Sequence, residues 1–78
     1  MKKVMAKLGT MRKAVEWVVY PPREDGKILI QCDRRICLFD PKTGEGRLSG
    51  SHNYPTILTL SLSDSQNIVV PPDVVAAA

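Results

Sequence analysis

The stretch KILIQCDRRICLFD, residues 27–40, carries the clearest strand pattern in the chain, and the fold depends on how it is interpreted. Side chains alternate between the two faces of a strand. Interpreted as one long strand, the stretch has a single charged residue, Arg34, on an otherwise apolar face made of Ile28, Ile30, Cys32, Ile36 and Leu38. One periodicity then runs through the whole segment, which favours a single strand.

The alternative is a hairpin that turns at Asp33–Arg34. It sets Lys27 opposite Asp40 at the open end, an opposite-charge pair, and it sets Ile28 opposite Phe39 and Ile30 opposite Cys37. Asp-Arg is a poor two-residue turn, however, because the favoured turn type needs positive φ at both central positions. We therefore favour one long or bulged strand with its irregularity at Asp33–Arg34, and the hairpin stays open as the alternative.

Further short strands are indicated on both sides of this stretch. Each is rich in β-branched or alternating apolar residues and is bounded by Pro, Gly, Asp or Asn. They cover AVEWVVY (14–20), Arg47–Ser49, TILTLSL (56–62) and Asn67–Val70. Turns are predicted at PPREDG and DPKTGEG, and a polar loop at 49–55.

The two ends of the chain are less regular. Apolar residues recur at three- and four-residue steps over residues 1–15, which fits an N-terminal helix, although Gly9 and Thr10 weaken it. Whether residues 1–10 belong to the fold or are dispensable stays open. At the other end, Asp73 could cap a stub of helix in DVVAAA, or residues 71–78 form a loose tail.

The chain of 78 residues is expected to form one small domain: a basic arm (1–13), a β body (14–70) and a tail (71–78). The fold class is mostly β, either all-β or α+β. A small antiparallel curled sheet or half-open barrel of four or five strands is predicted, with an N-terminal helix as an optional addition. SH3-like barrels, OB-like barrels and plain meanders all fit such short turns.

Positive charge is concentrated at the start of the chain. Residues 1–13 hold five basic residues and no acid, whereas residues 14–78 hold six basic and eight acidic residues. Such asymmetry is typical of contact with nucleic acid or another acidic partner, although it also serves solubility. The candidate phosphate contacts are Lys2, Lys3, Lys7, Arg12, Lys13, Arg34 and Arg35.

Aromatic side chains are scarce, and this counts against stacking on single-stranded bases. Trp17 and Phe39 are needed for the core of so small a domain. Tyr20 and Tyr54 are left as candidate surface aromatics.

No pattern of catalytic or metal-binding residues stands out. Cys32-x4-Cys37 with His52 lacks the ligand spacing of a structural zinc site, and on the single-strand interpretation the two Cys side chains point to opposite faces. A lone His beside Ser51 or Cys37 carries little information about catalysis. We expect no enzyme activity, no metal and no cofactor.

The function expected from these features is that of a small interaction module. Apolar residues on both faces of several strands predict self-association, with a dimer favoured, and action through a protein partner. The alternative is a nucleic-acid-binding accessory or regulatory protein that uses the basic arm. The apolar runs are far too short to span a membrane, and no secretory signal is visible, so a cytoplasmic location is expected.

Overall fold

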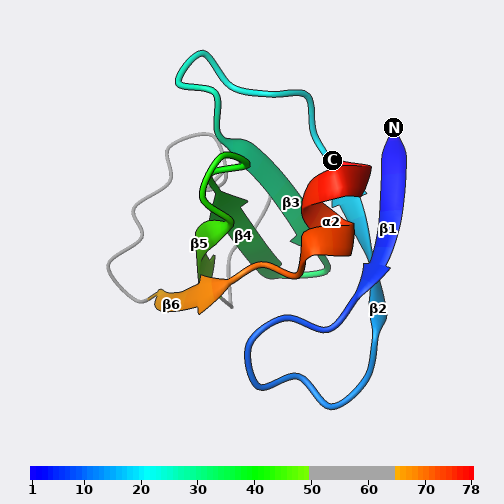
Figure 1. Cartoon of the computed structure of the whole chain (residues 1–78). Coiled ribbons are helices and arrows are strands. Elements are labelled where there is room, and N and C mark those ends of the chain that lie inside the picture. Colours follow the sequence, from blue (N-terminus) through cyan, green and yellow to red (C-terminus); the bar gives the residue numbers. More distant parts are fainter. Residues whose placement is uncertain (50–64) are drawn as a thin grey trace.

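The computed structural model of the protein describes residues 1–49 and 65–78 (Figure 1). In this part of the chain six strands form one antiparallel sheet, and their order in the sheet repeats their order in the sequence. The elements are β1 (Lys2–Ala6), β2 (Val15–Val19), β3 (Ile28–Cys32), β4 (Arg35–Phe39), β5 (Glu45–Ser49), β6 (Gln66–Val69) and the short helix α2 (Pro72–Ala77). The mostly β, antiparallel fold is confirmed. Its topology is a meander, with six strands where four or five were predicted.

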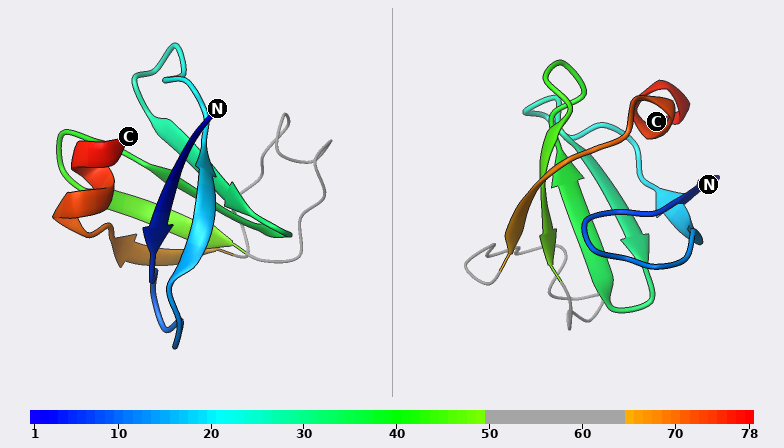
Figure 2. Two further views of the ribbon diagram at one scale, coloured as in Figure 1. Left: turned by 90° about the vertical axis from the view of Figure 1, so that its right-hand side faces the viewer. Right: turned by 60° about the horizontal axis from the view of Figure 1, so that its bottom comes forward.

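The sheet is curled but not closed (Figure 2). Within the described residues β1 and β6 are its two outer strands, and no pairing joins them. The loop between β1 and β2 reaches across toward β5 and β6, so that a Cβ built on Gly9 would lie 3.1 Å from Cδ2 of Leu48. Helix α2 packs against β1. The curl therefore has an inner face, which it wraps around, and an outer face.

Residues 27–40 form a hairpin, so the single-strand interpretation was wrong. Cys32 pairs with Arg35, Ile30 with Cys37 and Ile28 with Phe39, around a turn at Asp33–Arg34. Asp33 takes a φ of 51°, a left-handed conformation that aspartate tolerates better than most residues. The alternation of apolar residues looked continuous across the turn, but a two-residue turn changes which positions face inward. Even-numbered residues of β3 and odd-numbered residues of β4 lie on the same inner face.

Residues 1–15 do not form a helix. Residues 2–6 pair with β2 over their whole length, from Lys2 opposite Val19 to Ala6 opposite Val15. Ala6 and Leu8 are buried in the core, and the indole Nε1 of Trp17 donates a hydrogen bond to the carbonyl oxygen of Ala6 at 3.2 Å. Spacing at three and four residues was a poor guide here because partners in β2 and the core decide the conformation. The first ten residues belong to the fold.

The main core lies inside the curl. It is built around Trp17 and Phe39, as the sequence predicted, and its other buried members are Ala6, Leu8, Val19, Ile28, Ile30, Cys37, Val70 and Val74. Gly46 in β5 makes room for Phe39, since a Cβ there would stand 2.8 Å from the Cβ of Phe39. A second, smaller cluster of Leu29, Ile36 and Leu38 lies on the outer face, with Tyr20 packed against it.

The C-terminal residues dock onto the body of the protein. Val70 and Val74 are buried in the main core, so residues 71–78 are not a loose tail. The helix stub was expected in the right place, but Asp73 lies in the first turn and does not cap it; Pro71 occupies the N-cap position without a side-chain cap. No helix within the described residues has the length and apolar character needed to cross a membrane.

The remaining strands and turns lie close to where the sequence placed them. The strands predicted at 14–20, 47–49 and 67–70 are observed at 15–19, 45–49 and 66–69. Asp25 and Asp40 shape the two predicted turns by accepting backbone hydrogen bonds from Lys27 and Lys42 on their carboxylates. The predicted strand 56–62, most of the polar loop, His52 and Tyr54 lie outside the described residues.

Candidate nucleic-acid interface

The meander gathers basic residues at one end of the sheet. Because successive strands run in opposite directions, the β1–β2 loop, the β3–β4 turn, the end of β5 and the start of β6 all lie at that end. Among the described residues of that end, five basic residues and a single acid, Asp33, fall in the loop 7–14 and in 33–35, which we call the basic end and whose charges sum to +4. The basic residues are Lys7, Arg12, Lys13, Arg34 and Arg35.

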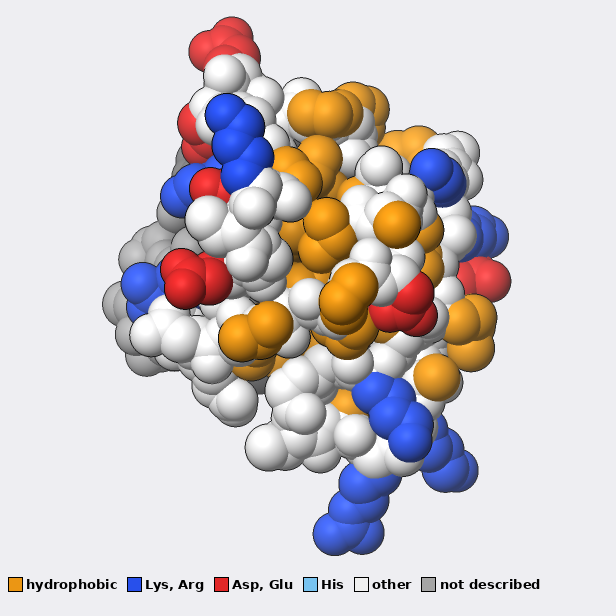
Figure 3. All heavy atoms as spheres, in the orientation of Figure 1, with side chains coloured by type: hydrophobic (Ala, Val, Ile, Leu, Met, Phe, Trp, Pro, Cys, Tyr) orange, Lys and Arg blue, Asp and Glu red, His pale blue; other side chains and the backbone are white. Residues whose placement is uncertain are grey.

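The opposite end of the sheet is balanced. The loops 20–27 and 40–44 carry three basic and three acidic residues, whose charges sum to zero. In Figure 3, Lys and Arg side chains project from the lower margin of the molecule with no acidic side chain beside them. Charge is therefore segregated along the strand direction, which produces a field that reaches beyond single contacts.

The predicted basic arm is not an arm, and the structure divides its members. Lys7, Arg12 and Lys13 lie in the β1–β2 loop at the basic end, whereas Lys2 and Lys3 lie in β1. Lys3 pairs with Glu16 of β2 at 3.5 Å, with both side chains more than half exposed, and Lys2 begins the strand at the opposite end. Residues from two separate parts of the chain, 7–13 and 34–35, thus meet where one continuous arm was expected.

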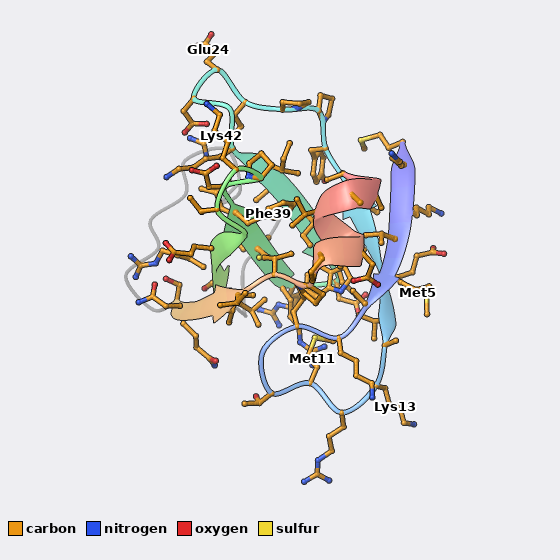
Figure 4. The ribbon with its side chains drawn as sticks, in the orientation of Figure 1. Met5, Met11, Lys13, Glu24, Phe39 and Lys42 are labelled. Atoms are coloured by element: carbon orange, nitrogen blue, oxygen red, sulfur yellow. The ribbon has the colours of Figure 1, made fainter. Side chains whose placement is uncertain are left out.

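A shallow depression lies at the basic end, at the mouth of the curl. Arg12 and Arg35 both line it, from the β1–β2 loop and from the start of β4, together with Leu8, Thr10, Met11, Leu48, Ser49 and Gln66. Both arginines are exposed, Met11 and Leu48 are half-buried, and Leu8 forms part of the core. Figure 4 shows Met11 in the β1–β2 loop beneath the sheet and Lys13 at the lower edge of that loop.

The hairpin explains why Arg35 reaches the mouth. Arg35 stands opposite Cys32 in the register, and its neighbours on the same face of β4 are Cys37 and Phe39, which are core residues. Arg35 therefore occupies the outermost inward-facing position of β4. The sequence could have placed it there only if residues 27–40 had been interpreted as a hairpin. Thr10 and Gln66 carry no sequence signal that marks them.

Side-chain hydrogen bonds join the β3–β4 turn to the outer face. The hydroxyl of Tyr20 donates to Oε1 of Gln31 at 2.5 Å, and Nε2 of Gln31 donates to the carbonyl oxygen of Asp33 at 3.2 Å. Tyr20 is half-buried against the outer cluster, so it is not the free surface aromatic that was expected. Trp17 and Phe39 are buried, and among residues 1–49 and 65–78 no aromatic side chain is left as a stacking platform.

The two cysteines share the inner face, because the hairpin sets Cys32 and Cys37 at inward positions of neighbouring strands. The opposite-face placement expected from a single strand was therefore wrong. Burial raises the pKa of the Cys37 thiol to about 12 and is also the largest cause that raises the pKa of Cys32. Both thiols thus stay protonated at neutral pH and are weak nucleophiles and metal ligands. The described residues gather no cluster of three or more metal-ligating side chains.

The chemistry of this arrangement suits the binding of anions. Residues with two guanidinium groups, a side-chain amide and two hydroxyls line the mouth of the curl, and such groups are hydrogen-bond donors in a region of positive potential. Comparisons with models of protein families, with curated proteins and with solved structures found no match for this chain.

Proposed function

We propose that the protein binds nucleic acid through its basic end, by contact with backbone phosphates and without recognition of base sequence. One observation carries this: five basic residues from two separate parts of the chain meet at one end of the sheet, with Asp33 as the only described acid among them. Lys and Arg side chains that neutralise phosphates release condensed counterions, and this supplies most of the affinity of sequence-independent binding.

Lack of base recognition follows from what the described residues do not offer. Stacking on single-stranded bases needs exposed aromatic side chains, and none is left exposed in this part of the chain. Base reading in the major groove commonly uses a helix with side chains that reach the base edges. Helix α2 has six residues, carries Asp73 in its first turn and has no basic residue in its last turn.

The test is fluorescence anisotropy with short labelled DNA duplexes of two unrelated sequences, from about 50 to 200 mM salt. We expect equal affinities for the two sequences. The slope of log affinity against log salt is expected to be at most about −4 to −5, because each neutralised phosphate contributes about −0.9 and the basic end offers five cations.

A matched pair of variants locates the contact. The triple variant Lys7→Gln, Lys13→Gln, Arg34→Gln removes three charges from the basic end, and the triple variant Lys2→Gln, Lys27→Gln, Lys42→Gln removes three elsewhere. All six side chains are exposed. The first triple should flatten the slope by about 3 units and the second should leave it nearly unchanged. No binding at the lowest salt, or equal loss in both triples, would remove the proposal.

Self-association and a protein partner remain a second candidate. It is favoured by the two outer strands of the open sheet, where Met5 of β1 is 57% exposed and Val69 of β6 is 78% exposed. The outer-face residues Leu29, Ile36 and Leu38 are already buried in a single chain, so they need no second copy to cover them. Light scattering at micromolar concentration tests self-association, and a monomer would contradict it.

A further inference from the structure

The depression at the mouth of the curl brings together two arginines that are far apart in the sequence. Arg12 comes from the β1–β2 loop, and Arg35 comes from the first position of β4. Gln66, at the first position of β6, and Thr10 line the same depression. With Ser49 at the end of β5, five residues that carry hydrogen-bonding side chains, from four parts of the fold, line one depression.

Arg35 is the one charged residue among the inward-facing positions of the β3–β4 hairpin. All the other inward positions of the β3–β4 hairpin are apolar: Ile28, Ile30, Cys32, Cys37 and Phe39. An arginine at the end of this row keeps its guanidinium at the mouth, where it is exposed. Neither Arg12 nor Arg35 forms an ion pair with a carboxylate of residues 1–49 or 65–78.

The local environment differs from that of the other cations of the basic end. Leu8 from the core and the half-buried Met11 and Leu48 line the depression beside its polar residues. The lining of the depression is mainly polar, so it offers several hydrogen-bond donors close to two positive charges, and charge-assisted hydrogen bonds are stronger than neutral ones. Lys7, Lys13 and Arg34 do not line this depression.

We propose that this depression holds one phosphate group of the nucleic-acid backbone between the guanidinium groups of Arg12 and Arg35, with the amide of Gln66 and the hydroxyl of Thr10 as neutral donors. The guanidinium group is planar and presents paired N–H donors that match two phosphate oxygens, which an ammonium group cannot do. The inference rests on the proposed function and adds to it a defined contact within an otherwise diffuse field.

A localised contact of this kind depends on the guanidinium geometry and not only on charge. Arg35→Lys and Arg12→Lys keep the charge of the basic end but remove the paired donors. Arg34→Lys makes the same exchange outside the depression, and Lys13→Arg makes the reverse exchange there. These four single variants distinguish a phosphate site that depends on guanidinium geometry from binding that depends only on the total charge of the basic end.

We expect Arg35→Lys and Arg12→Lys to weaken binding of the labelled duplex by about tenfold each, the loss of one bidentate phosphate contact. Their salt slopes should match that of the parent chain because the charge is unchanged. Arg34→Lys and Lys13→Arg should change affinity by less than about twofold. Thermal unfolding of each variant checks the fold, which exposed substitutions at these positions should leave intact.

The double variant Arg12→Lys, Arg35→Lys tests whether the two groups share one phosphate. If they do, the double variant loses less affinity than the product of the two single losses, because the first substitution already disrupts the shared contact. Independent losses would place them on separate phosphates and would overturn the inference.

The outcomes separate this inference from the proposed function. If the two depression variants bind like the parent chain while the triple variant of the basic end still loses its salt dependence, the protein binds nucleic acid but has no such site. If the parent chain binds no duplex at the lowest salt, both proposals fail together.

Discussion

Asp33 shows how much of this fold depends on a single backbone conformation. It is the only residue other than glycine with positive φ among the described residues, and it lies in the two-residue turn that makes residues 27–40 a hairpin. This turn also sets the register that brings Arg35 to the mouth of the curl. Because Asp33 is exposed, substitutions there change backbone strain with little effect on packing.

We expect Asp33→Val to lower the free energy of unfolding by about 1–2 kcal/mol, the cost of the left-handed conformation for a β-branched residue. Asp33→Asn, which tolerates that conformation, should change it by less than about 0.5 kcal/mol. Urea unfolding followed by the fluorescence of Trp17 measures both. Equal stability of the two variants would mean that the turn is not strained.

Cys37 links folding stability to pH. Its pKa rises from 9.0 to about 12 on burial, so the folded chain keeps the thiol proton in a range where the unfolded chain has lost it. Stability should therefore be fully present below about pH 9 and fall as the pH rises, by at most about 1.4 kcal/mol per pH unit from this group. The parent chain should lose stability more steeply than Cys37→Ala as the pH rises from about 9 toward 12. Parallel curves would contradict this.

At the scale of elements, β1 is the strand that the sequence concealed. Its inward-facing residues are Lys2, Val4 and Ala6, so the alternation of apolar and polar residues is weak. The spacing of its apolar residues also fits a helix. What settles its conformation is not local: it is the pairing with β2, the bond from Trp17 to Ala6, and the contact with α2. Interactions with residues far along the chain leave little trace in a short window of sequence.

We expect a truncated chain that begins at Ala14 to lose cooperative unfolding, because it lacks β1 and the buried Leu8. The single variant Leu8→Ala, with the strand retained, should lose about 2–5 kcal/mol. Thermal unfolding followed by circular dichroism distinguishes the two chains. A sharp transition in the truncated chain would show that residues 1–13 are an appendage after all.

The elements that the sequence predicts and those it does not predict differ in how locally their conformation is determined. The strands at 15–19 and 66–69 are bounded by prolines and turn residues, and Trp17 and Phe39 are large enough that a domain this small needs them inside. The hairpin at 28–39 was hidden because both interpretations keep an apolar face, and only the tolerance of Asp33 for positive φ decides between them. Candidate cations could be named from composition, but their separation into two groups needed the register.

At the scale of the whole molecule, charge segregation governs how the protein would meet a polyanion. Among the described residues, the segments 7–14 and 33–35 at one end carry a charge of +4 and the loops 20–27 and 40–44 at the other carry zero, and such a difference orients a chain before contact. We expect the association rate with duplex DNA to fall steeply with salt, and the dissociation rate to change less. Stopped-flow anisotropy measures both rates. Association that is insensitive to salt would argue against an oriented encounter.

The meander has a consequence for how the molecule assembles itself. Since strand order repeats chain order, every described pairing joins neighbours along the chain, and contacts of this kind reduce the entropy lost in closing loops. Folding can then advance hairpin by hairpin from either side of β3–β4. The packing of α2 on β1 joins the two most distant elements, so it is the step that must wait for the rest. We therefore expect the pairing of neighbouring strands to be fast and the docking of α2 on β1 to be the slower step.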